Sequence, residues 1–293
     1  MKYENIKNYS DAKFRRISGM RRKTFSKAIE KLNKKYAEEH SGNIRGSGRK
    51  SKLSMEDKLL ATLEYLREYR TLAHIAASYD IHESNIQRIV IWVENTLISD
   101  GIFRLPGKAT LLAEDCEYEI IQIDATESPI ERPKKNRKRN KMRIKNRKNE
   151  QKRWYSGKKK RHTTKTLVVV CKKSRNIICV VFCNGKKHDF RLFTESEIRM
   201  LESINAQTDT GFIGIENHHK NSTLPHKKPK GGELTQEQKR ENRAISSSRV
   251  SNEHAIGFVK RFKILNERYR GRRKRFGLRF NLIAGICNSE LIN

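Results

Sequence analysis

Hydrophobic residues in the first third of the chain recur every three or four positions, which is the period of an α-helix. The spacing predicts helices over residues 21–39, after Ser54, over 72–79 and over 83–97. The compact turn Asp80-Ile81-His82 separates the last two. Two helices joined in this way are typical of a helix-turn-helix, whose second helix enters the major groove of DNA with its first turn. An ordinary three-helix bundle that reads no bases has the same pattern.

Polar residues at the start of the 83–97 helix lie off its apolar stripe. The candidates for contacts with DNA bases and phosphates are Ser84, Asn85, Gln87 and Arg88. Before this region, the Gly- and Arg-rich stretch 41–50 is typical of a flexible basic linker. Its Arg45 and Arg49 are candidates for the minor groove of DNA, and a simple solvated tether is the alternative.

A short stretch with Pro106, residues 101–107, separates this helical region from a second region with strand patterns. Strands are predicted over residues 118–123, 166–170 and 177–182, and the last two form an antiparallel hairpin. Helices are predicted over 189–200 and 249–265. We therefore expect a multi-domain protein: residues 1–50 as a helix and linker, 51–107 as an all-α helix-turn-helix domain, and 108–293 as an α/β domain.

The chain carries 65 lysines and arginines against 33 acidic residues, a formal net charge of +32. Such an excess selects a polyanionic partner, of which nucleic acid is the commonest. A structural RNA-binding protein would fit the charge as well. The basic segment 132–161 is predicted to be a loop that grips phosphates, and its candidate DNA contacts are Trp154, Lys158, Lys159, Lys160 and Arg161. Trp154 would stack on an unpaired base, with core packing as the alternative.

The sequence has no run of about eighteen apolar residues, and its N-terminus has no apolar signal core. We therefore expect a soluble cytoplasmic protein with no membrane partner. Five cysteines without a C-x2-C pair argue against a disulfide framework.

Two isolated aspartates, Asp124 and Asp209, stand at the ends of short strand-like or turn-like segments, and Glu253 follows between two cations, Arg249 and Lys260. Three carboxylates can hold two divalent ions that act on a phosphodiester, so the pattern indicates a two-metal nuclease. If the last segment is one helix, its two cations and Glu253 share a face, where the cations can grip phosphates. A solvated face of ion pairs is the alternative.

Three further acids are weaker candidates. Glu127 follows Asp124 by an odd number of residues, so on a strand it faces the opposite side. Glu131 and Asp189 are reserves should one member of the triad be misassigned.

The acids belong to longer motifs that extend over most of the chain. These motifs are Ile123-Asp124-Ala125-Thr126-Glu127 with residues 129–133, the stretch 155–163, Asn184-Gly185-Lys186-Lys187-His188-Asp189-Phe190, Asp209-Thr210-Gly211-Phe212-Ile213-Gly214, Arg249-Val250-Ser251-Asn252-Glu253, and residues 272–288. Together they resemble the insertion-sequence transposases of the IS5 family, which are DDE transposases with an N-terminal helix-turn-helix.

The resemblance implies an RNase H-like α/β catalytic domain in which Asp124, Asp209 and Glu253 hold Mg²⁺ or Mn²⁺. The implied function is binding of terminal inverted repeats, followed by metal-dependent DNA cleavage and strand transfer. The implied partners are double-stranded DNA, both the repeats and a target, and further copies of the chain as a homodimer or higher oligomer. The implied location is the nucleoid of a bacterium.

The family's third acid lies in the signature Y-x2-R-x3-E-x6-K, so the resemblance makes Arg249 and Lys260 its catalytic cations. Ser246 stands where the signature has tyrosine. This departure removes a hydroxyl or stacking contact to DNA and leaves the metal ligands in place. It supports the alternative function of a catalytically inactive, transposase-derived DNA-binding regulator, against which the three intact acids argue.

Overall fold

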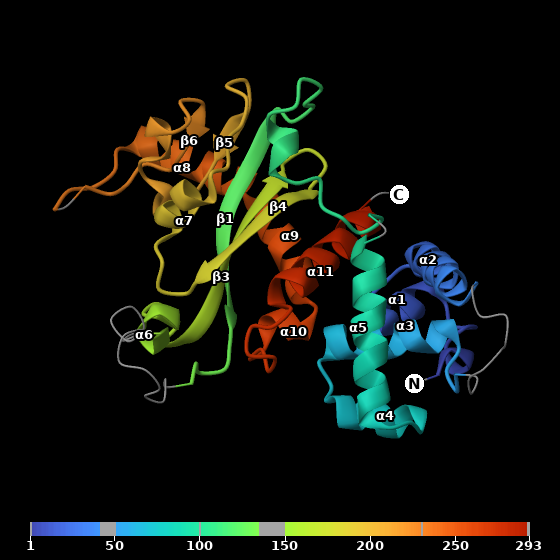
Figure 1. The fold of residues 1–293 in the computed structure, drawn as a ribbon. Coiled ribbons are helices and arrows are strands. Elements are labelled where there is room, and N and C mark those ends of the chain that lie inside the picture. Colours follow the sequence, from blue (N-terminus) through green and yellow to red (C-terminus); the bar gives the residue numbers. More distant parts are fainter. Residues whose placement is uncertain (1, 42–50, 100, 135–149, 230, 292–293) are drawn as a thin grey trace. The chain divides into compact units, whose positions relative to one another are not determined.

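The computed structural model describes residues 2–41, 51–99, 101–134, 150–229 and 231–291 (Figure 1). They form two compact units. The first contains the described residues of 1–104, 259–266 and 275–293, and the second those of 105–258 and 267–274. The helical region and the strand region thus separate within the predicted stretch 101–107. Residues 259–266 and 275–293, which the sequence patterns group with the strands, pack with the N-terminal helices instead.

The first unit is built from α-helices with short turns of other helix types. Its α-helices are α1 (Asp11–Ser18), α2 (Arg22–His40), α3 (Met55–Leu63), α4 (Leu72–Tyr79), α5 (Glu83–Ser99), α10 (Lys263–Asn266) and α11 (Phe276–Leu291). The helices predicted from periodicity over 21–39, 72–79 and 83–97 are confirmed, and α1 was not predicted. In the described residues, no helix is long and apolar enough to cross a membrane.

Local capping explains where two of these helices begin. The Ser54 hydroxyl accepts a 3.1 Å hydrogen bond from the N–H of Asp57 at the start of α3, as its sequence pattern predicts. The Thr71 hydroxyl caps α4 by accepting a 3.2 Å bond from the N–H of His74. After α4 the chain turns at Asp80, whose φ of 52° is left-handed and ends the helix.

The C-terminal helix α11 is part of the first unit because of two close contacts. Glu94 of α5 is fully buried and accepts hydrogen bonds of 2.7 Å from Nε of both Arg275 and Arg279. A side chain at Gly285 would place its Cβ 1.8 Å from the carbonyl oxygen of Phe103. Glycine therefore lets α11 pack directly against backbone at this point.

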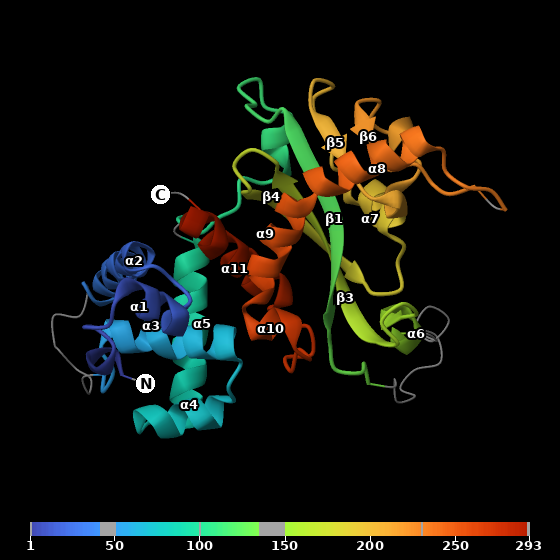
Figure 2. The ribbon, with the colours of Figure 1, turned by 180° about the vertical axis from the view of Figure 1, so that it is seen from behind.

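The second unit is a mixed sheet with helices on its faces. Its elements are β1 (Ile120–Pro129), α6 (Glu150–Trp154), β2 (Tyr155–Ser156), β3 (Arg161–Cys171), β4 (Ile177–Asn184), α7 (Asp189–Ser196), β5 (Asn205–Gln207), β6 (Ser222–Thr223), α8 (Gln236–Ser248) and α9 (Val250–Lys260), the last of which continues into the first unit. Seen from opposite sides, Figures 1 and 2 place α7 on one face of the sheet and α8 and α9 on the other.

Strand pairing gives the sheet its order. β3 pairs antiparallel with β1 on one side and with β2 and β4 on the other, and β5 and then β6 follow β1 in parallel. The predicted hairpin of β3 and β4 is confirmed, and so is the expected fold class of a helix-turn-helix region followed by an α/β domain.

The two faces of β1 differ in chemistry. Ile121 and Ile123 are fully buried in a hydrophobic cluster that includes Leu192 and Phe193 of α7. Gln122 and Asp124 alternate with them, so their side chains belong to the other face, where α8 and α9 lie. The alternation thus presents polar side chains to the helices that carry the third candidate acid.

Several element boundaries differ from the predictions. The strand predicted over 166–170 is longer and runs from Arg161 to Cys171. The strand predicted over 118–123 begins at Ile120 and continues past Asp124 to Pro129, because β3 pairs with it along this whole length. The helix predicted over 189–200 ends at Ser196, because Glu197 adopts a left-handed φ of 52°. The closing helix predicted over 249–265 is split into α9 and α10, which are separated by residues 261–262.

Candidate active site and DNA-binding surface

Asp124 and Asp209 lie just beyond the paired residues of two neighbouring parallel strands. β1 and β5 pair with Gln122 opposite Gln207, and each aspartate comes two residues later. Asp209 precedes a 3-10 turn, and its Oδ1 accepts a 2.9 Å hydrogen bond from the N–H of Gly211. The parallel pairing thus brings together two acids that are far apart in the sequence.

Arg249 lies at the junction of α8 and α9, next to Asp124. Its Nη2 is 3.9 Å from Asp124 Oδ2. The residue before it, Ser248, is bonded to both central strands: Gln122 Nε2 donates to its carbonyl oxygen at 2.7 Å, and its hydroxyl donates to Gln207 Oε1 at 2.8 Å. These amide contacts hold the junction against the sheet.

Sequence reasoning missed Gln122, Gln207 and Ser248. A signal was present, because each glutamine is a polar residue two positions before one of the aspartates. On a strand, side chains two positions apart point to the same face, so each glutamine is expected on the same face as the aspartate that follows it.

Glu253 lies in the first turn of α9, one helical turn after Arg249, and its side chain is exposed. Within the described residues, no group of three or more His, Cys, Asp or Glu side chains is arranged to hold a metal ion. The structure therefore places Arg249 beside Asp124, Asp209 after the neighbouring parallel strand, and Glu253 one helical turn beyond Arg249. Lys260 is the last residue of α9.

Asp189, a reserve candidate, lies close to Asp209. A Cβ added to Gly211 would be 2.9 Å from Asp209 Oδ1 and 3.2 Å from Asp189 Oδ2. The buried Lys165 of β3 binds Asp189, donating from Nζ to Asp189 Oδ1 at 2.6 Å. Sequence reasoning did not single out Lys165, because nothing in a strand pattern distinguishes a buried lysine from an exposed one.

Glu127 belongs to the face of β1 opposite Asp124, as its odd offset predicts. It accepts a 2.7 Å hydrogen bond from the Thr163 hydroxyl, and its Oε1 lies 4.0 Å from Lys165 Nζ. Glu127 therefore serves an ion pair inside the unit and does not face the Asp124 carboxylate.

Two family models match the chain over the regions just described. Residues 51–101 match a helix-turn-helix of the DDE superfamily endonucleases, and residues 123–288, more than half of the chain, match the DDE superfamily endonuclease itself. The chain belongs to the DDE superfamily endonucleases. It is 42% identical, over 99% of each chain, to a probable transposase for insertion sequence element IS702 from Microchaete diplosiphon. No solved structure matches it. The predicted kinship with insertion-sequence transposases is thus confirmed.

Burial dominates the titration of Asp124 in this DDE endonuclease. It raises the pKa of Asp124, and the charges of Asp209 and Asp189 add smaller increases, whereas the Ala125 N–H and Arg249 lower it, so that the pKa comes to about 6. A divalent cation bound to the carboxylate would stabilise its charged form.

The residues fit a divalent metal ion. Carboxylate oxygens are the ligands that Mg²⁺ and Mn²⁺ prefer. The absence of a side chain at Gly211 leaves space beside Asp209 and Asp189, since a Cβ there would crowd both carboxylates. Membership of the family implies dependence on a divalent metal.

We expect Asp124→Asn to stabilise the metal-free endonuclease near neutral pH. Between pH 3.8 and about 6 the folded protein keeps a proton on Asp124 that the unfolded chain has released, so stability falls as pH rises through this window. Above this window the full destabilisation by the buried charge is present, and the asparagine removes on the order of 3 kcal/mol.

Urea unfolding in EDTA at about pH 7 and about pH 4 measures this effect. The gain in unfolding free energy should be present at the higher pH and absent at the lower one. Asp115→Asn, which changes an exposed aspartate of the same unit, should show no gain at either pH. A destabilised Asp124→Asn protein at neutral pH would contradict the prediction.

The predicted DNA contacts of the helix-turn-helix lie at the start of α5. Asn85, Gln87 and Arg88 are exposed and Ser84 is half-buried, whereas Ile86 between them is fully buried. Arg88 Nη1 donates to Asn85 Oδ1 at 3.3 Å. The start of α5 thus presents exposed polar side chains, and their contact with DNA stays a prediction.

The structure describes only some of the candidate DNA contacts on the two basic segments. Arg45, Arg49 and residues 135–149 lie outside the described residues. The residues from Lys158 to Arg161 are all exposed at the turn before β3. Trp154 lies beneath a guanidinium, with Cζ of Arg273 4.1 Å from its ring centre, so its indole already has a stacking partner.

Proposed function

We propose that this DDE endonuclease binds the terminal inverted repeats of an insertion sequence, cleaves phosphodiesters at those ends with Mg²⁺ or Mn²⁺, and joins the freed 3′ hydroxyl to target DNA. The observation that carries the proposal is the adjacency of Asp124 and Asp209 at the parallel pairing of β1 and β5, with Arg249 held 3.9 Å from Asp124. Because an element has two ends, we expect at least two copies of the chain on the DNA.

Each residue has a distinct part in the proposed reaction. Asp124 and Asp209 would hold the divalent ions, and Glu253 would complete the ligand set from the first turn of α9. The chemistry supplied by such ions, when bound, is activation of the attacking oxygen and stabilisation of the departing one. Arg249 and Lys260 would hold the phosphates at the scissile position.

The hydrogen bonds of Ser248 give a reason for the place of Arg249. Gln122 and Gln207 attach the junction of α8 and α9 to the strands that carry the two aspartates. A cation fixed relative to the carboxylates can hold a phosphate in one orientation, which favours the chemical step more than overall affinity.

The experiment that tests the proposal is cleavage of duplex DNA that carries the ends of the source element. We expect strand cleavage with Mg²⁺ or Mn²⁺ and none in EDTA, with joined products when a target duplex is added. Binding to the ends without cleavage under any metal condition would contradict the proposal.

The second candidate function is a DNA-binding regulator that has lost the chemistry. One observation favours it: Ser246 is exposed on α8 where the family signature has tyrosine. The cleavage experiment separates the two functions, because a regulator binds the ends and leaves them intact.

We expect Arg88→Ala and Asn85→Ala to weaken discrimination between the terminal repeat and random DNA. A well-placed contact to a base edge contributes about 1–3 kcal/mol of discrimination, so the specificity ratio should fall roughly 5- to 150-fold for each variant. Competition binding in EDTA measures the ratio. Arg16→Ala, an exposed arginine of α1, is the control that should leave it unchanged. An Arg88→Ala protein that discriminates like its parent would show that α5 is not the reader.

A further inference from the structure

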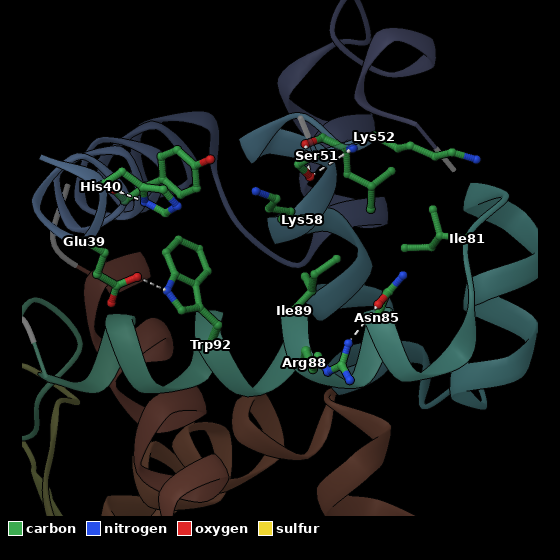
Figure 3. A pocket seen from close by; sticks show the side chains of 12 residues that line it. Glu39, His40, Ser51, Lys52, Lys58, Ile81, Asn85, Arg88, Ile89 and Trp92 are labelled. Carbon is green, nitrogen blue, oxygen red and sulfur yellow. Dashed lines mark hydrogen bonds between the residues drawn. The ribbon is translucent and has the colours of Figure 1, made fainter. Parts of the chain in front are cut away.

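A groove of about 560 Å³ runs between α2, the start of α3 and the exposed side of α5, wholly within the first unit (Figure 3). We call it the α2–α5 groove. The residues that matter for its chemistry are Tyr36, His40, Lys58, Asn85, Arg88 and Trp92. Two of them, Asn85 and Arg88, are proposed DNA contacts, so the groove is continuous with the helix-turn-helix surface.

Lys58 is a buried cation without a carboxylate partner. Only 9% of the residue is exposed, and within the described residues no carboxylate lies within 4.0 Å of its ammonium group. Instead Nζ lies 5.0 Å from the ring centre of Tyr36 and 5.9 Å from that of Trp92. Figure 3 shows its amino group directed at this aromatic side of the groove.

The comparison with Lys165 shows why this is unusual. Lys165 is equally buried but donates to Asp189 and to a backbone carbonyl. Burial without such partners lowers the pKa of Lys58, because the charged form is poorly solvated. An ammonium kept in this state lowers stability unless an anion compensates it.

The residues around Lys58 have the positive charge and the aromatic rings that suit binding of a polyanion. Arg88 and Lys52 add positive charge to the lining, and the one lining carboxylate, Glu39, is occupied by a 2.9 Å hydrogen bond from Trp92 Nε1. Aromatic rings beside a cation suit the sugar or base that adjoins a phosphate. Phosphate contacts of this kind set the register of a recognition helix on the duplex.

We propose that the α2–α5 groove binds a backbone phosphate of DNA, with the Lys58 ammonium as its counter-charge and the rings of Tyr36 and Trp92 against the adjoining nucleotide. This inference rests on the proposed DNA binding by the helix-turn-helix, and it assigns Lys58 and Trp92 a part that the sequence patterns did not suggest.

The test uses the full chain in EDTA, with Lys58→Met measured against random duplex and against the terminal repeat. Each phosphate contact contributes about 0.9 to the slope of log affinity against log salt, so the slope should fall by about 0.9 on both DNAs. Affinity should fall about eightfold at 0.1 M salt and converge with the parent's near 1 M. Lys27→Met, an exposed lysine of α2 outside the groove, should leave the slope unchanged.

A second measurement follows Trp92 directly. The chain has two tryptophans, so Trp154→Phe leaves Trp92 as the single indole reporter. The Trp92 fluorescence of this variant should change and then saturate as DNA is added. In a separate thermal unfolding measurement, Lys58→Met should be no less stable than the parent, because the substitution removes an uncompensated buried charge.

An unchanged salt slope for Lys58→Met, or a Trp92 signal that does not respond to bound DNA, would overturn the inference. A loss of slope accompanied by partial unfolding of Lys58→Met would also count against it. If the protein neither prefers the repeat nor cleaves DNA, the proposed function fails, but a slope reduced by Lys58→Met on random duplex would still support the phosphate site.

Discussion

Asp124→Ala and Asp209→Ala are expected to abolish DNA cleavage while DNA binding persists. Each aspartate follows the paired residues of β1 and β5 by two positions, where the two would hold the divalent ions. Loss of a ligand removes several kcal/mol of transition-state stabilisation, which corresponds to a fall in rate of at least about a thousandfold. Binding should survive because the helix-turn-helix and the basic surface supply it.

Single-turnover cleavage with saturating protein separates this effect from any change in affinity. Glu237→Ala, which removes an exposed carboxylate from the first turn of α8, is the matched control and should cleave like the parent. Cleavage that survives in Asp124→Ala or Asp209→Ala would show that the strand ends are not the catalytic centre.

Glu253→Ala extends the same experiment to the third acid, and we expect the same loss. Its exposed side chain lies one helical turn from Arg249, which is 3.9 Å from Asp124. If Glu253→Ala cleaves normally, Asp189 becomes the alternative third acid, because its Oδ2 already lies beside the Asp209 turn. Asp189→Asn would then lose activity where Glu253→Ala does not.

Glu94→Ala is expected to destabilise the first unit by about 3–5 kcal/mol, because it leaves two guanidinium groups without their buried counter-charge. Glu94 is fully buried and accepts 2.7 Å hydrogen bonds from Arg275 and Arg279, which join α11 to α5. A loss of this size is a large part of the free energy of unfolding of most domains.

Chemical unfolding followed by circular dichroism measures the change. Glu30→Ala, which removes an exposed glutamate from α2, is the control and should alter the free energy of unfolding by no more than about 0.5 kcal/mol. If Glu94→Ala unfolds like its parent, the ion pairs between α5 and α11 contribute nothing net to stability.

Local patterns determined the helices of the first unit. In α2, α4 and α5 the apolar residues recur with the helical period inside each segment. The hydroxyl that caps α3 belongs to the residue just before that helix. Helix signals of this kind depend on neighbours three or four residues apart, so they can be recognised without knowing the rest of the fold. Asp124, Asp209 and Glu253 were likewise predicted from short blocks of sequence, and their catalytic roles stay a prediction.

Only the tertiary structure decided which of these residues meet. The extension of β1 past Asp124 depends on pairing with β3, and the adjacency of Asp124 and Asp209 depends on pairing with β5. The placement of α11 beside α5 depends on a carboxylate and two arginines that are 181 and 185 residues away from it in the sequence. No period within one segment encodes such contacts.

The environments of the two buried lysines also depend on the tertiary structure. A lysine in a sequence pattern reads as exposed, and burial of Lys58 and Lys165 results from neighbours that other segments supply. For Lys165 those neighbours include a carboxylate, and for Lys58 they are aromatic rings. The sequence by itself determined the residue types and the helices that carry them. The tertiary structure decided which charges are compensated within the fold and which are not, because compensation depends on distances between segments that only folding sets.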